Sequence, residues 1–81
     1  MSRIAELAER AMADRVGAAR IFDLKLNYLA EARGAEELTA TAGIVHAGRR
    51  TIVTECRIEA ADGRLIATAS ATFAVTEEQE D

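Results

Sequence analysis

Few residues of this sequence stand out as able to take part in chemistry: two adjacent arginines, one histidine and one cysteine. Arg49 and Arg50 are the only adjacent basic residues and could pair with phosphates, or could be ordinary solubilising charge in a turn. His46 has no serine or cysteine partner at a recognisable spacing, and it is interpreted as a surface residue. Cys56 stands among apolar residues and is interpreted as a buried small side chain.

Composition limits the class of protein. A chain of 81 residues forms one domain, and its net charge of −4 argues against nucleic acid as a partner. The single cysteine allows no internal disulfide and no thiol-based metal site. No apolar run approaches the roughly 20 residues that cross a bilayer, so no membrane association is expected. We therefore expect a cytoplasmic protein without a metal site.

A helix is predicted over residues 3–16. Apolar residues recur at the spacing of one helical face, at Ile4, Leu7, Ala8, Ala11 and Met12. Ser2 is a plausible N-cap and Gly17 a plausible stop. At 100° per residue, Glu9 falls on the shoulder of the apolar face. It could border a crevice there, or it could be a solvated surface glutamate.

Alternating apolar and polar residues predict four strands over residues 21–29, 38–45, 52–58 and 65–75. In the first strand, Phe22, Leu24, Leu26 and Tyr28 are expected to face one way, with Tyr28 beneath the helix. In the last strand, Ile66 is expected on the face opposite to Ala67. A turn within residues 31–37, a tight connection at residues 47–49 and an Asp62-Gly63 hairpin, where both residues tolerate positive φ, predict an antiparallel meander. The fold class is therefore α+β, with one helix packed on the apolar face of a four-stranded antiparallel sheet.

Four segments, in this order, resemble hotdog-fold acyl-CoA thioesterases of the phenylacetate-degradation (PaaI) type, which are relatives of the 4-hydroxybenzoyl-CoA thioesterases. They are residues 24–29 (LKLNYL), 38–42 (LTATA), 45–51 (VHAGRRT) and 62–69 (DGRLIATA). Family members normally begin with a further strand and a His-Gly-Gly loop, whereas this chain starts at the helix. The resemblance implies a hotdog-like domain over residues 1–76, truncated at the N-terminus, followed by an acidic disordered tail at residues 77–81.

The resemblance also implies roles for individual residues. Glu9 occupies the position of the family's catalytic helix carboxylate, which acts as a nucleophile or as a general base toward water. The backbone amides of Ser2 and Arg3 stand nearest to the position of the family's oxyanion-stabilising amide at the helix N-terminus. The residues implied to bind substrate are Asn27, Tyr28, Arg49 and Arg50. Coenzyme A enters as part of the substrate, and no cofactor is implied.

Two functions remain open at this point. The first is hydrolysis of acyl-CoA thioesters, and the second is a non-catalytic, truncated hotdog module for oligomeric assembly or acyl-ligand binding. In both, we expect a homodimer or homotetramer, because a domain of this size buries only about 60% of its unfolded surface. Absence of the usual first strand would also leave a sheet edge open for pairing.

Overall fold

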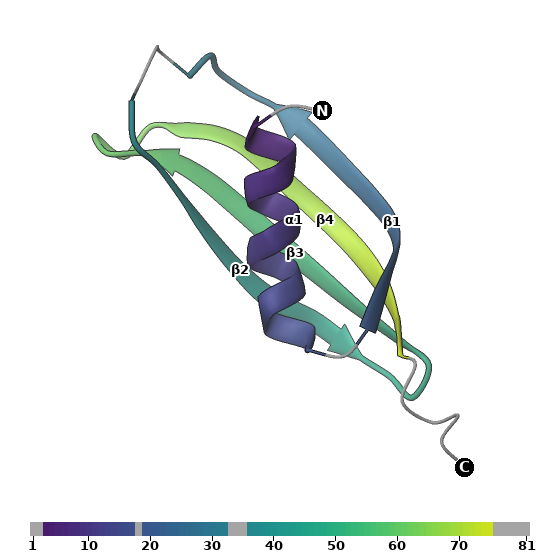
Figure 1. Cartoon of the computed structure of the whole chain (residues 1–81). Helices are drawn as coiled ribbons and strands as arrows, with labels where there is room; N and C mark the ends of the chain where they lie inside the picture. Colours follow the sequence, from purple (N-terminus) through teal and green to yellow (C-terminus); the bar gives the residue numbers. More distant parts are fainter. Residues whose placement is uncertain (1–2, 18, 33–35, 76–81) are drawn as a thin grey trace.

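The computed structural model describes residues 3–17, 19–32 and 36–75, which form one helix and four strands (Figure 1). The elements are α1 (Arg3–Val16), β1 (Ala19–Tyr28), β2 (Leu38–Ala47), β3 (Thr51–Ala60) and β4 (Leu65–Val75). The predicted helix and all four predicted strands are present, with bounds within two residues of those expected from the sequence. The predicted cap Ser2 and the predicted tail, residues 77–81, lie outside the described residues.

Helix α1 ends where the sequence predicts. The backbone amide of Gly17 donates to the carbonyl of Ala13 at 3.2 Å, and Gly17 has a φ of 68°, in the left-handed region that glycine adopts without steric cost. The side chains of α1 that are buried are Ala5, Ala8 and Met12. Because two of these are alanines, the helix backbone can pack close to the sheet.

The four strands form one antiparallel sheet in the order β1-β4-β3-β2. Strands β2, β3 and β4 form the predicted meander, but β1 pairs with β4 and not with β2. The turn predicted within residues 31–37 therefore does not join neighbouring strands, because the connection leads from one edge of the sheet to the other. Local turn signals do not select a strand's partner. In the observed pairing, Leu24 and Leu26 stand opposite Ala71 and Ala69, so both leucines lie on the face that the helix covers.

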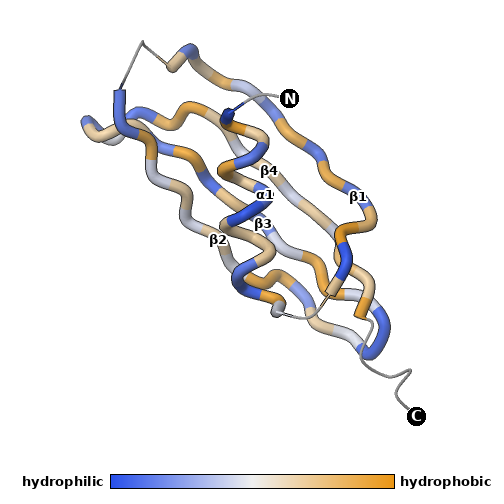
Figure 2. Tube along the Cα trace, in the orientation of Figure 1, coloured by the Kyte–Doolittle hydropathy of each residue, from blue (hydrophilic) through white to orange (hydrophobic). Residues whose placement is uncertain are grey.

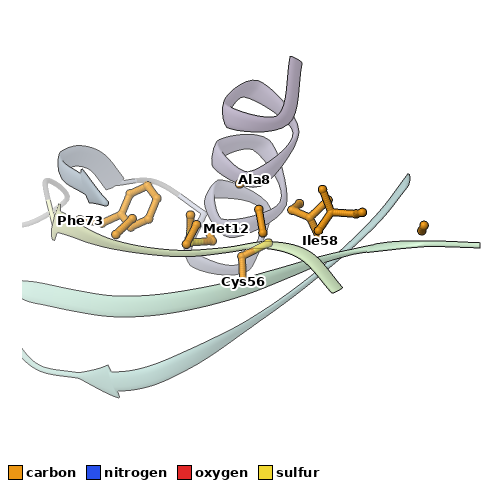
Figure 3. Packing of buried hydrophobic residues seen from close by; sticks show 10 residues of the cluster. Ala8, Met12, Cys56, Ile58 and Phe73 are labelled. Carbon is orange, nitrogen blue, oxygen red and sulfur yellow. The ribbon is translucent and has the colours of Figure 1, made fainter. Parts of the chain in front are cut away.

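The core lies between α1 and one face of the sheet. Figure 3 shows Ala8 and Met12 of the helix above Cys56, Ile58 and Phe73 of the inner strands. Hydrophobic positions alternate with hydrophilic ones along the strands in Figure 2, as expected for a sheet with one buried and one open face. The side chains of Phe73, Met12 and Ile58 are the largest that are fully buried.

The placement of Phe22, Tyr28 and Ile66 differs from the prediction. Phe22 is 76% exposed, because a register shift between Ile21 and Asp23 inserts an extra residue and takes Phe22 out of the buried row. Tyr28 pairs with Ala67 on the helix side but is 55% exposed, so it does not lie beneath the helix. The helix packs more closely over β2 and β3 than over β1 and β4, which leaves the end of β1 uncovered. A further register shift near the end of β3 places Ile66 in the core, not on the open face.

The predicted Asp62-Gly63 hairpin is confirmed, but by a different mechanism. Of the described non-glycine residues, none has a positive φ, and within this hairpin only Gly63 does, at 93°. The amide of Gly63 donates to the carbonyl of Ala60 at 2.9 Å. Asp62 contributes through its carboxylate, which accepts a hydrogen bond of 3.0 Å from the backbone amide of Arg64.

Candidate functional site

Glu9 is a half-buried carboxylate in the middle of α1. It lies about 60° around the helix from Met12, whose side chain is fully buried. The amphipathic pattern of the helix therefore places Glu9 at the boundary between the face packed on the sheet and the solvated face. A carboxylate at such a boundary reaches water while it borders apolar surface.

An open depression on α1 surrounds Glu9. It is lined by Glu6, Glu9, Arg10 and Ala13. Glu6 precedes Glu9 by three residues and Ala13 follows by four, a spacing that brings side chains together on one flank of a helix. Glu6 is not among the residues predicted to form the site, although its spacing from Glu9 is visible in the sequence. The depression thus combines two carboxylates and a guanidinium beside a small residue that leaves room above it.

The backbone amide of Arg3 lies in the first turn of α1, where the helix dipole and free amide donors favour negative charge. The guanidinium of Arg3 donates to the carbonyl of Glu36 at 3.4 Å, which links the start of the helix to the segment before β2. Ser2, the other residue expected near an oxyanion, lies outside the described residues. Arg3 and Glu9 are about 9 Å apart along the helix axis.

Asn27 and Tyr28 point to opposite faces of the sheet. Asn27 pairs with Thr68 on the open face, whereas Tyr28 pairs with Ala67 on the helix side. Both residues are exposed. Of the two, only Tyr28 shares a face of the sheet with α1, so the two residues do not form one subsite within a single chain.

Arg49 and Arg50 are exposed residues in the connection between β2 and β3. The carbonyl of Arg50 accepts a hydrogen bond of 2.9 Å from the amide of Val75, the last residue of β4. This connection lies at the end of the sheet opposite to the start of α1 (Figure 1). A single chain therefore keeps the arginine pair and the first turn of the helix apart.

The remaining candidates are placed as the sequence indicated. His46 is exposed near the end of β2, and Cys56 is buried in β3 with an exposed fraction of 1%. Burial raises the pKa of the Cys56 thiol, partly offset by a hydrogen bond with the backbone of Thr41. A neutral, inaccessible thiol is a poor nucleophile.

Within residues 3–17, 19–32 and 36–75, no three His, Cys, Asp or Glu side chains gather as metal ligands would. No helix in this part of the chain combines the length and apolar character that crossing a membrane requires.

A single helix packed on one face of an antiparallel sheet, with the strands in this arrangement, is the hotdog fold. The family model of the thioesterase superfamily matches residues 2–67, and the chain therefore belongs to this family. No curated protein matches the chain.

Solved structures give the same fold. The BH2602 protein from Bacillus halodurans, solved with CoA, has a TM-score of 0.83 and 28% identity, and the match covers 91% of this chain and 57% of that one. A hypothetical thioesterase from Streptococcus pneumoniae, solved with coenzyme A, has a TM-score of 0.70 and 31% identity over 72% of this chain and 47% of that one. The smu.793 protein from Streptococcus mutans, bound to acetyl CoA, has a TM-score of 0.69 and 28% identity over 72% and 47% of the two chains. This chain thus spans about half the length of these relatives.

Proposed function

We propose that this protein hydrolyses acyl-CoA thioesters, with Glu9 as the catalytic carboxylate. The observation that carries the proposal is a half-buried glutamate on the flank of the single helix of a thioesterase-superfamily fold. Similar structures that contain coenzyme A or acetyl CoA support the choice of substrate class.

In the proposed reaction, Glu9 accepts a proton from a water molecule whose oxygen bonds to the thioester carbonyl carbon. The carbonyl oxygen becomes an oxyanion, and first-turn amides of α1, such as that of Arg3, stabilise it by hydrogen bonding in the positive field of the helix terminus. The oxyanion then collapses, the C–S bond breaks, and the proton held by Glu9 passes to the leaving sulfur. The products are a carboxylic acid and free coenzyme A, and the reaction uses no separate cofactor.

The geometry favours a site built from two copies of the chain. Arg3 and Glu9 are about 9 Å apart along one helix. The backbone amide of Arg3 and the carboxylate of Glu9 from the same helix are therefore poorly placed to contact one small thioester group together. Arg49 and Arg50 are also remote from the start of α1, but in a dimer or tetramer another copy could bring them to the nucleotide phosphates of the substrate. Tyr28, exposed on the helix side of edge strand β1, would then line the acyl site.

The two sheet edges support such assembly. Within the part of the chain that the structure describes, strands β1 and β2 each have one side without a neighbouring strand, and such edges pair readily with other chains. Light scattering at micromolar concentration is expected to give a multiple of the 8.7 kDa chain mass. A monomeric mass would contradict the two-copy site.

The catalytic role of Glu9 is tested by steady-state hydrolysis of a panel of acyl-CoA thioesters. Glu9→Gln is expected to lower kcat by about 10²–10⁴-fold, the usual contribution of a general base. Glu6→Gln is the matched control, because it removes a carboxylate from the same depression and is expected to keep most of the activity. Wild-type turnover at background level, or equal rates for wild type and Glu9→Gln, would refute the proposal. Coenzyme A binding without turnover would favour the non-catalytic module.

A further inference from the structure

Arg64 joins separate parts of the chain at one end of the sheet. Its guanidinium donates to both carboxylate oxygens of Glu36, at 2.6 and 2.8 Å, and Nε donates to Asp62 at 3.2 Å. A further hydrogen bond of 3.5 Å reaches the carbonyl of Glu31. The β3–β4 hairpin is thereby tied both to the residues just after β1 and to those just before β2.

The connection continues from Glu36 to the helix. The backbone carbonyl of Glu36 accepts a hydrogen bond of 3.4 Å from the guanidinium of Arg3, the first residue of α1. Arg64, Glu36 and Arg3 thus form a chain of contacts from the hairpin to the first turn of the helix. The Glu36 carboxylate is 18% exposed and the Arg64 side chain 30% exposed, so water screens their interaction less than it screens a fully exposed pair.

A second Arg–Glu pair in the same molecule provides a contrast. Arg57 donates to Glu59 at 2.9 Å, but these residues are two apart on one strand, and the Arg57 side chain is 60% exposed. That pair lies within one strand and connects no separate parts of the chain. The Arg64–Glu36 pair spans 28 positions of sequence and joins the β3–β4 hairpin to the residues just before β2.

We propose that Arg64 is a positioning residue that, through Glu36, holds Arg3 and the first turn of α1 against the end of the sheet. Its importance for catalysis rests on the proposed function, in which first-turn amides stabilise the oxyanion. Arginine suits this role because its Nη2 contacts both carboxylate oxygens of Glu36, which leaves Nε for Asp62 and Nη1 for the carbonyl of Glu31. Lysine, a point charge, cannot make these contacts together.

The first test measures backbone hydrogen exchange by mass spectrometry and does not depend on activity. In Arg64→Met, the hydrogen-bonded amides of residues 6–8 in α1 and those of residues 29 and 30 are expected to exchange about tenfold faster, the equivalent of one hydrogen bond to a charged group. Amides of β3 and β4 are expected to be unchanged. Arg57→Met is the matched control and is expected to exchange like wild type throughout.

Further variants separate positioning from general destabilisation. Glu36→Gln is expected to accelerate exchange in the same two segments, and combining it with Arg64→Met is expected to add little, because both changes break one contact. Arg64→Lys is expected to fall between wild type and Arg64→Met. If Arg64→Met exchanges like wild type in residues 6–8, or if Arg57→Met shows the same acceleration, the positioning role is refuted.

The second test is kinetic. Arg64→Met is expected to lower kcat more than it raises KM, because a displaced oxyanion donor weakens binding of the transition state more than binding of the substrate. A rise in KM with kcat unchanged would overturn the catalytic part of the proposal. Absence of turnover in wild type would refute the proposed function alone, since the exchange result still decides whether Arg64 holds the helix.

Discussion

The inner strands and the edge strands of this sheet are nearly equal in length but differ completely in burial. Strands β3 and β4 contain every buried residue of the described sheet, and β1 and β2 contain none. The large hydrophobic residues that remain exposed lie on the edge strands or directly after β1, at Ile21, Phe22, Tyr28, Leu29, Ile44 and Val45. Stability is therefore concentrated in the inner strands and α1, whereas the edge strands present the surface available to another chain.

Each edge strand also contains a bulge. The register shifts between Ile21 and Asp23 in β1, and between Ile44 and His46 in β2. Bulges bend an edge and interrupt its hydrogen-bonding groups, so they limit which stretch of an edge can accept a further strand. The regular parts of β1 and β2, away from the bulges, are where pairing with a second copy is expected.

The largest expected effect concerns the two phenylalanines of the chain. Phe73→Ala, which empties a fully buried site on β4, is expected to lower the free energy of unfolding by about 3–5 kcal/mol. Phe22→Ala, at the 76% exposed bulge of β1, is expected to change it by less than about 0.5 kcal/mol. Urea unfolding at several protein concentrations tests both. If Phe22→Ala lowers the free energy of unfolding by a large amount that does not depend on protein concentration, the contrast between inner and edge strands is wrong.

An intermediate effect is expected at Thr54. This residue is fully buried on β3, and its hydroxyl donates to the carbonyl of Ala71 at 3.2 Å. Thr54→Val is expected to cost about 1 kcal/mol, the net value of one buried hydrogen bond. Thr41→Val, at an exposed position of β2, is the matched control and is expected to be neutral in the same unfolding assay. Equal costs for both variants would show that burial does not distinguish the strands in this respect.

A smaller effect of opposite sign is expected at Gly43 of β2. An added Cβ would meet no atom within 4 Å, and the backbone there does not need a positive φ. Gly43→Thr is expected to raise the free energy of unfolding by a few tenths of a kcal/mol, since glycine weakens strand interiors. Thermal unfolding measures this change. A destabilised variant would indicate that the edge strand is more constrained than its exposure suggests.

The smallest effect is expected from the titration of Cys56 on β3. Its pKa is raised by burial, so its contribution to stability is fully present below the ordinary thiol pKa of about 8.5 and is lost as the pH rises above it. Cys56→Ala is expected to abolish this alkaline decline. The measurement is the urea midpoint of unfolding between pH 7 and 10. If the midpoint falls equally steeply with pH in wild type and Cys56→Ala, the alkaline decline does not come from Cys56.

Much of the fold was predictable because the relevant signals are local. The 3.6-residue period of α1, the two-residue period of the strands and the helix stop at Gly17 all arise from neighbours in sequence. The position of Glu9 at the border of the packed face follows from the same helical period. The bulges at Phe22 and Ile66 were not predictable, because the alternation of apolar and polar residues does not reveal where one strand contains an extra residue.

The sequence by itself determined the elements, most of their buried positions and the candidate carboxylate, since periodicity and turn chemistry act over a few residues. Only the tertiary structure decided that β1 pairs with β4, that Asn27 and Tyr28 face opposite sides, and that Arg64 reaches Glu36. These outcomes depend on contacts between residues far apart in the chain. Such contacts form when the free energy gained from apolar burial and hydrogen bonds exceeds the entropic cost of closing a long loop. The sequence of one segment alone does not determine that difference.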